Sequence, residues 1–595
     1  MSNKKQHDEE HSKIYKVWLW VKRWWLPIAI LLITSIGLAC ALSIPQRVFE
    51  TPREPANDKS APVLLAQSNL RLAFLYITGG AIAVMGLVET FRKNNNEKLK
   101  NDKDKEKNDR DHLRQVRAER RERYTKAVEQ LGSKETPVRM GGVYTLVGLV
   151  DEWLEEESLS ENEKLKEGQV IINNLCAYIR SPFTLASQHG KLSQNKIKSK
   201  NKFKKFIRKY IQQNFYINKA NFQAEVDVRL SIIKEIHDRL KGPEENTPGA
   251  WSDFEYDFSG STFFYPIDLK NSYYAKPINF SGSTYQGGAD FTGSTYEGWA
   301  YFTGSTYQSR ADFSGSTYQG WADFSGSTYQ GVADFSGSTY QSRADFSGST
   351  YQGVAYFSGS TYQGGADFSL STYQGGAYFG GSTYQGGAYF GGSTYQDEAY
   401  FGGSTYQGGA YFGGSTYQGG ANFRGSTYKS WAYFSDSTYK SWAYFSDSTY
   451  ENETDFSGSI FYQETYFGED GYSNSSSCFT NHAPQFYDKK KRKNTLFGSH
   501  NNDFTVDIDK GYPIDLDSKG IPLNCKFLTS EQKEYPEGKL QEIEKINNKL
   551  FEVKDLAKKT ELSEKLRSLN KELHKWREEA TSVNAENVAA EDTES

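Results

Sequence analysis

The sequence predicts a mixed fold class: a long coil of stacked short β-strands, with apolar helices before it and further helices on both sides. Three observations carry this prediction. Between residues 258 and 467 a phenylalanine returns every 11 positions, except at Leu269, and an aromatic residue stands five positions after each of these. Two uncharged apolar runs, at about 24–44 and 70–88, lie near the N-terminus. After residue 537, leucines recur at helical spacing among charged residues.

The repeat unit is A-D-F-S-G-S-T-Y-Q-G-G or a close variant, and a small residue stands two positions before each aromatic. Side chains two positions apart on an extended chain share a face, so Ala289 with Phe291, and Ser294 with Tyr296, are expected to point inward. The Gly and Ser pairs predict a corner after every two or three extended residues. The buried Tyr hydroxyls are expected to reach a Ser side chain, a corner carbonyl or solvent.

These units resemble the bacterial pentapeptide-repeat family, whose A-[DN]-[LF]-x-x units wind into a right-handed quadrilateral parallel β-helix. Residues 311–315 (ADFSG) fit that pattern. In this chain every second step has one extra residue, so a four-sided coil is expected to use about 22 residues and to contain two aromatic pairs. At the usual strand spacing, roughly nine to ten coils would form a rod on the order of 45 Å long.

The segment before the coil resembles a helical module of membrane-anchored members of the same family. The residues that carry the resemblance are RYTKAVEQLGS at 123–133 and VRMGGVYTL at 138–146. Their apolar residues also fall at helical spacing, and Gly141 and Gly142 would permit close helix contact. We expect a small α-helical bundle that covers the exposed end of the first coil.

The two apolar runs predict a transmembrane helical hairpin over 24–91. Lys and Arg residues precede the first run and follow the second, whereas the loop between them has few. The positive-inside rule therefore predicts a multi-pass protein of the bacterial inner membrane with both termini in the cytoplasm. A signal peptide cleaved near the small-x-small pattern at Cys40 is the alternative. A small-residue stripe in the second run, Gly79, Gly80, Ala83 and Gly86, favours packing within the hairpin over dimerisation.

A basic segment interrupts the helical domain. Between residues 191 and 209 there are nine Lys or Arg residues, no acidic residue and interleaved phenylalanines. Anionic lipid is the partner expected next to a membrane, while a merely solvated insertion and nucleic acid are the alternatives, nucleic acid being disfavoured. The candidate lipid-contact residues are Lys198, Lys202, Lys204, Lys205 and Arg208.

The C-terminal leucines form an apolar seam that also includes Trp576. A break near 559–561 would let two helices fold into a hairpin over the distal end of the coil. Self-association through a short coiled coil, giving a homo-oligomer, is the alternative.

The sequence contains few residues in a pattern typical of a catalytic or metal site. His7 and His11 flank Glu10 at a spacing that holds metal on a helix, but they lie in a short polar tail with no apolar run to build a pocket. The four cysteines are far apart, and no phosphate-binding glycine loop occurs. We therefore expect a protein that is not an enzyme, with no metal site and no cofactor.

The outward positions of the repeat are the best place to look for binding. The residue before each Phe is mainly Asp in the first half of the coil and mainly Tyr in the second, and Trp recurs at one corner position. An outward aromatic column either marks a partner surface or stabilises neighbouring strands as a ladder. The candidate partner surface is Trp299, Trp321, Tyr378, Tyr389, Tyr400, Tyr411, Trp431 and Trp442.

The leading functional hypothesis is a membrane-anchored scaffold that presents a rigid cytoplasmic β-helix to protein partners. The resemblance also implies an alternative, a DNA mimic that binds a topoisomerase, but the coil has only 16 acidic against 7 basic residues. A third hypothesis, adsorption to a regular surface through the threonine array, requires an extracellular coil.

These expectations divide the chain into eight segments. They are a cytoplasmic N-terminus (1–23), the transmembrane hairpin (24–91), a charged helical linker (92–122), the α-helical domain (123–250), the β-helix (256–470), an irregular segment (471–536), C-terminal helices or a short coiled coil (537–580) and a disordered tail (581–595).

Overall fold

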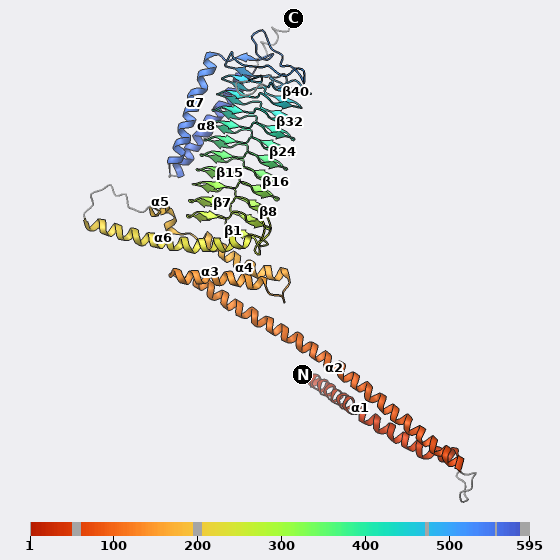
Figure 1. Cartoon of the computed structure of the whole chain (residues 1–595). Coiled ribbons are helices and arrows are strands. Elements are labelled where there is room, and N and C mark those ends of the chain that lie inside the picture. Colours follow the sequence, from red (N-terminus) through yellow and green to blue (C-terminus); the bar gives the residue numbers. More distant parts are fainter. Residues whose placement is uncertain (1, 50–60, 194–204, 470–474, 554–555, 583–595) are drawn as a thin grey trace. The chain divides into compact units, whose positions relative to one another are not determined.

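A computed structural model describes residues 2–49, 61–193, 205–469, 475–553 and 556–582 (Figure 1). The chain forms two compact units, Met1–Glu119 and Arg120–Ser595. We describe each by itself.

The first unit consists of helix α1 (Ser2–Val48) and most of helix α2 (Ala61–Leu131). Both helices contain a stretch that is long and apolar enough to cross a membrane. The two helices approach closely where a Cβ on Gly37 would lie 2.2 Å from Thr78 Oγ1. Gln67 Nε2 donates a 2.6 Å hydrogen bond to the Phe49 carbonyl at the turn of this hairpin. The second apolar run continues into the charged linker as one helix.

The expectation that the glycine stripe of α2 packs within the hairpin is wrong. A Cβ added to Gly79, Gly80 or Gly86 would meet no described atom within 4 Å. The close approach uses Gly37 of α1 instead, because Thr78 of α2 lies directly against it.

The second unit begins with a helical bundle formed by the end of α2 and five further elements. They are α3 (Thr136–Leu154), α4 (Glu161–Arg180), η1 (Thr184–Gln188), α5 (His189–Leu192) and α6 (Lys205–Leu240). The predicted close helix contact is made by Gly142, where a Cβ would lie 2.8 Å from the Ala127 carbonyl. Gly141 has no described neighbour at that range. The apolar core of the bundle includes the fully buried Leu146, Leu149 and Ile172.

The bundle packs on the first coil, as predicted. The Phe222 ring of α6 lies 5.2 Å from the Phe264 ring of the coil. Gln169 of α4 exchanges hydrogen bonds of 2.8 and 2.9 Å with the backbone of Glu255. The buried Arg229 lies over the Phe264 ring and forms a 2.7 Å ion pair with Glu225. Apolar and charge-assisted contacts therefore both cover the open end of the coil.

The coil has four parallel sheets, one on each side, built from strands of two residues. The first coil supplies β1 (Tyr256–Asp257), β2 (Thr262–Phe263), β3 (Ile267–Asp268) and β4 (Tyr273–Tyr274). We name each sheet after its first strand. The β1, β3 and β4 sheets have 10 strands and the β2 sheet has 12. Up to β39 (Thr465–Tyr466), each strand pairs with a strand 22 residues away in the sequence, for example Thr306 with Thr328, which confirms the predicted coil length.

The interior consists of stacked rings, as the sequence predicts. Phe313 and Phe335 lie 5.0 Å apart with ring planes 1° from parallel, and Tyr307 and Tyr329 lie 4.8 Å apart. Within a coil, Phe313 meets Phe324 edge to face at 5.0 Å. Each coil therefore holds two aromatic pairs.

A column of buried serines ties successive coils together. Ser316 Oγ donates a 3.1 Å hydrogen bond to the Phe291 carbonyl and accepts one of 3.2 Å from the Ser294 amide. The same pattern recurs along the coil, for example at Ser338. Each of these serine hydroxyls thus satisfies a backbone amide and a backbone carbonyl that would otherwise be buried without a partner.

The inward Tyr hydroxyls differ from the expectation. From Tyr285 to Tyr450 they are buried and form no hydrogen bond with any described residue. Burial raises the pKa of these tyrosines, and for most of them the serine two positions earlier opposes that rise, as Ser294 does for Tyr296. Its hydroxyl, however, is already engaged by the backbone.

The coil continues beyond residue 470, where the sequence suggested an irregular segment. Phe479 belongs to β40 (Cys478–Phe479), and its ring stacks 4.7 Å from the Tyr450 ring of the preceding coil. The Phe486 ring stacks 5.0 Å from the Phe456 ring. The strands β43 (Leu496–Phe497) and β44 (Lys526–Phe527) extend the β2 sheet. The small hairpin of β41 (Tyr487–Asp488) and β42 (Lys493–Asn494) leaves the coil here. Irregular spacing hides this extension in the sequence, because the stacked rings no longer follow the 11-residue period.

The C-terminal helices α7 (Ser530–Glu552) and α8 (Leu556–Thr581) form a hairpin that lies alongside the coil (Figure 1). The turn lies near Val553, not at 559–561. The leucine seam packs inside the hairpin on Ile543 and Ile546. Trp576 packs on Ile460 at the side of the coil, so the hairpin covers the β2 sheet rather than the distal end. The structure does not show a coiled coil between chains, because the leucine seam of α8 packs against α7 of the same chain.

Candidate functional site

The coil places the candidate tyrosines on two opposite sides. Tyr389 and Tyr411 belong to strands β25 (Ala388–Tyr389) and β29 (Ala410–Tyr411) of the β1 sheet. Tyr378 and Tyr400 belong to β23 (Ala377–Tyr378) and β27 (Ala399–Tyr400) of the β3 sheet. The chain visits the four sheets in order, so the β1 and β3 sheets are two sides apart. The eight candidate residues therefore cannot form one continuous surface.

The tryptophans divide in the same way. Trp299, Trp321 and Trp431 precede strands of the β1 sheet, whereas Trp442 precedes β35 (Ala443–Tyr444) of the β3 sheet. Trp299 and Trp321 lie one coil apart with ring centres 5.8 Å from each other, as predicted from the coil length.

The β1 sheet carries the more exposed aromatic side chains. Trp299, Trp431 and Tyr389 are 51%, 47% and 42% exposed. Tyr389 stacks on Tyr411 at 4.9 Å, and Trp431 meets Tyr411 edge to face at 6.2 Å. We call Trp299, Trp321, Tyr389, Tyr411 and Trp431 the β1 aromatic face.

A shallow hollow interrupts this face. It has a volume of about 370 Å³ and is lined by Arg343, Gly365, Asp367 and Tyr389. The Arg343 guanidinium lies 5.9 Å from the Trp321 ring and 2.9 Å from Asp345. The β1 aromatic face thus combines exposed rings with one cation, a composition typical of protein-binding surfaces.

Outward rings lie over glycines on both the β1 and the β3 side. On the β3 side, a Cβ on Gly380 would lie 2.2 Å from the Tyr400 ring, and one on Gly376 would lie 2.9 Å from the Tyr378 ring. On the β1 side, a Cβ on Gly387 would lie 2.8 Å from the Tyr389 hydroxyl oxygen. Glycine beneath the ring is therefore common to both sides, and the greater exposure of Tyr389 is what distinguishes the β1 side.

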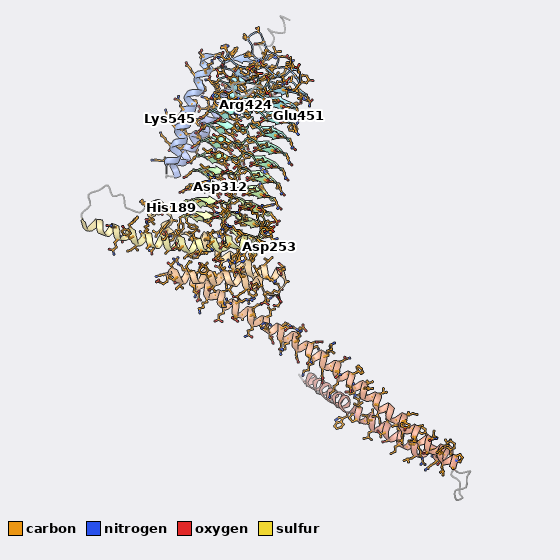
Figure 2. The ribbon with its side chains drawn as sticks, in the orientation of Figure 1. His189, Asp253, Asp312, Arg424, Glu451 and Lys545 are labelled. Atoms are coloured by element: carbon orange, nitrogen blue, oxygen red, sulfur yellow. The ribbon has the colours of Figure 1, made fainter. Side chains whose placement is uncertain are left out.

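The outward aspartates stabilise corners. Asp312, labelled in Figure 2, accepts hydrogen bonds from the Ser314 amide at 3.1 Å and from Ser314 Oγ at 2.6 Å. Arg310 bridges Asp312 and Asp334 at 2.7 and 3.0 Å. Burial alone would raise the pKa of Asp312, but the bonds from Ser314 and Arg310 hold it below its ordinary value. Because these carboxylates are engaged locally, they do not support a DNA mimic.

The remaining candidates lie partly outside the described residues. Lys198, Lys202 and Lys204 are not described, and Lys205 and Arg208 belong to α6 without described side chains. His7 and His11 belong to α1, and their side chains are likewise outside the described part. In the part of the chain whose side chains are described, no three His, Cys, Asp or Glu residues gather as metal ligands.

The four cysteines are free thiols. Burial raises the pKa of Cys176 to about 12 and that of Cys525 to about 12. At neutral pH both stay protonated, so neither has the low pKa of a catalytic nucleophile.

A cavity lies between the C-terminal hairpin and the β2 sheet, and Arg577 and Leu370 are among the residues that line it. This cavity was not expected from the sequence. One signal was readable. Leu370 occupies a corner position where the other repeats have Gly, apart from Asn271, Asp436 and Asp447.

Comparison with known families supports the assignment of the coil. Residues 319–361 and 346–394 match the family model described as pentapeptide repeats (9 copies). No curated protein and no solved structure matches the chain. Proteins built on this repeat typically act as interaction scaffolds and are generally not enzymes. The matched segments lie within ten stacked four-sided coils, so the sequence match at residues 319–394 and the fold of the β-helix both point to the pentapeptide-repeat family.

Proposed function

We propose that this protein is a membrane-anchored, non-enzymatic scaffold whose β1 aromatic face binds a protein partner. The observation that carries the proposal is the gathering of exposed Trp and Tyr side chains on one side of a rigid coil. Aromatic residues and Arg are enriched where proteins bind each other, because they offer large contact areas at low entropic cost.

The other sides of the coil fit this role less well. The hairpin of α7 and α8 occupies part of the β2 sheet. On the β3 sheet, Tyr378 and Tyr400 are less exposed than Tyr389 of the β1 sheet. The β4 sheet presents mainly threonines, such as Thr317 and Thr339, in an array without protruding rings. The β1 aromatic face is thus the side that has both exposed rings and a hollow.

The proposed anchor is the helical hairpin, with both termini in the cytoplasm. The apolar stretches of α1 and α2 support it, as does the basic excess on the outer flanks of both runs. The basic segment that includes Lys198, Lys202, Lys204, Lys205 and Arg208 would add contacts with anionic headgroups at about 1 kcal/mol per residue near the surface.

The binding proposal is tested on the full chain, expressed in bacterial cells and cross-linked before purification. The variant Tyr389→Ser/Tyr411→Ser removes the stacked pair of the β1 aromatic face. The matched control, Tyr378→Ser/Tyr400→Ser, makes the same chemical change on the opposite side. We expect a cross-linked partner to be recovered with the wild type and with the control variant, but not with Tyr389→Ser/Tyr411→Ser.

Melting temperatures separate binding from stability. The first variant loses the stacking of Tyr389 on Tyr411, and the control loses the stacking of Tyr378 on Tyr356. Losing one such pair costs about 0.5–1.5 kcal/mol, which both variants should show. Partners retained by Tyr389→Ser/Tyr411→Ser, or lost equally from both variants, would reject the β1 aromatic face as the binding site.

The anchor is tested by protease treatment of intact and lysed spheroplasts. The C-terminal half should be cut only after lysis, and the chain should stay in the membrane fraction at high salt. Cleavage in intact spheroplasts would place the coil outside the cytoplasm and reject the proposed orientation. Release by salt would reject the anchor.

A further inference from the structure

A cavity of about 320 Å³ lies between the C-terminal hairpin and the outer face of the β2 sheet. Its floor is a ladder of threonines on successive coils. They are Thr372 in β22 (Thr372–Tyr373), Thr394 in β26 (Thr394–Tyr395), Thr416 in β30 (Thr416–Tyr417) and Thr438 in β34 (Thr438–Tyr439). Apolar side chains of α7 and α8 form the opposite wall, including Ile543, Leu566, Leu573 and Trp576. The cavity therefore has a hydroxyl-rich side and an apolar side.

Arg577 of α8 is the charged group of this cavity and is only 8% exposed. Among the described residues, none forms a hydrogen bond or ion pair with its guanidinium. The two nearest carboxylates have other partners: Asp436 pairs with Lys493 at 2.7 Å, and Glu578 faces His574 at 3.8 Å. A buried guanidinium without a bonded anion is unfavourable, because the charge loses its hydration without compensation.

A second, independent observation falls at the same place. Leu370 lines the cavity and has a φ of 58°, in the left-handed region that disfavours side chains. The equivalent corner is Gly in neighbouring coils, for example Gly348 and Gly392. Leu370 is nevertheless 72% exposed and is not needed for the core. Strained backbone of this kind clusters at ligand clamps, where a specific side chain is required.

We propose that this cavity binds a small organic anion, with its carboxylate or phosphate group against Arg577 and the threonine hydroxyls. The apolar body of the ligand would lie between Leu370 and the leucines of α8. Both chemical requirements are met by the lining: a bidentate cation for the oxyanion and an apolar wall for the remainder. Since coil and hairpin both contribute, the bound anion would hold the hairpin against the coil.

The proposal is tested by isothermal titration of the full chain, purified in a neutral detergent, with empty micelles as the blank. The probes are benzoate, phenyl phosphate, benzyl alcohol and inorganic phosphate. Benzoate and phenyl phosphate share an apolar ring but differ in the oxyanion, so their ranking identifies the preferred head group. We expect at least one of them to bind with one-to-one stoichiometry, and benzyl alcohol to bind at least tenfold more weakly.

Two variants locate the site. Arg577→Met should weaken the better probe by roughly ten- to a hundredfold, the range of a charge-assisted hydrogen bond. Arg567→Met makes the same change at an exposed position of α8 and should bind like the wild type. Leu370→Gly restores the repeat residue, relieves the strained backbone and should fold normally while weakening the probe several-fold.

Hydrogen exchange supplies a readout that does not depend on the variants folding alike. The better probe should slow amide exchange in α8 of the wild type. The proposal is overturned if neither organic anion binds, if inorganic phosphate binds equally well, or if Arg577→Met and Leu370→Gly both leave the affinity unchanged.

Discussion

Raising the pH should unfold the coil in one cooperative step, because its inward tyrosines cannot ionise while they are buried. Burial raises the pKa of all 16 tyrosines of this series from Tyr285 to Tyr450. In the unfolded chain the same groups titrate near pH 10. The folded state therefore keeps protons that the unfolded state releases. This stability is fully present below pH 10 and is lost as the pH rises above it.

The size of the effect follows from linkage. A tyrosine that stays protonated when folded costs about 0.4 kcal/mol of stability at pH 10 and about 1.4 kcal/mol at pH 11. Sixteen of them together cost about 6 kcal/mol and about 23 kcal/mol. A coil of about 210 residues is expected to have a free energy of unfolding on the order of 10–30 kcal/mol. The transition should therefore lie near pH 11.

The assay follows phenolate absorbance and circular dichroism through the same titration. The 16 inward tyrosines should ionise in a separate phenolate step whose midpoint coincides with the loss of the β-signal, after the exposed tyrosines have titrated. Ionisation of all 41 tyrosines while the β-signal is intact would refute the buried columns. Replacing several inward tyrosines with Phe, starting at Tyr340, is the matched control. The midpoint should move to higher pH, because fewer groups then titrate and the lost hydroxyls had no partner.

Three further perturbations test the packing of the coil and bundle. Ser316→Ala should cost about 1–3 kcal/mol in urea unfolding, because it leaves a buried amide and a carbonyl without a partner. Gly386→Ala should markedly lower the melting temperature, since its Cβ would lie 2.5 Å from a backbone oxygen of the neighbouring coil, whereas Gly365→Ala has room and should not. Cys176 and Cys525 should resist thiol reagents at pH 8 until the protein is unfolded, because burial raises the pKa of each to about 12. Rapid labelling of the folded protein would contradict their burial.

The coil could be predicted in detail because its structure is periodic and local. A side chain repeated at one phase of the 11-residue unit must occupy one environment, so inward Phe291 and Tyr296 are evident from spacing alone. The sides of the coil are less evident. One unit covers half a coil, and neighbouring units such as those of Tyr378 and Tyr389 therefore face opposite directions. Residues at the same position of successive 11-residue units therefore lie alternately on two opposite faces of the coil.

The position of the hairpin on the β2 sheet, and the cavity beneath it, could not be predicted, because they depend on contacts between distant parts of the chain. The leucine seam indicates that α8 packs on something, but α7, a second chain and the coil satisfy it equally well in the sequence. The position of Trp576 against Ile460 decides the matter in the structure. Arg577 resembles any surface arginine of a charged helix until that contact buries it. Leu370, the one apolar residue in a corner column of Gly, Asn and Asp, is the sequence signal for this region.

The outward columns follow two corner chemistries rather than a free choice of surface residue. Where Asp precedes Phe, as at Asp312, a Ser two positions later donates its amide and hydroxyl to the carboxylate. Where Tyr takes that place, as at Tyr400, Gly402 can follow and the ring lies over it. Other outward tyrosines, such as Tyr356 and Tyr433, are followed by Ser instead, so this second pattern covers only part of the Tyr column. Binding is better sought where a side chain departs from both patterns, as the tryptophan corners of the β1 aromatic face do, since Trp299 and Trp431 neither brace a corner through a carboxylate nor lose most of their surface to the coil.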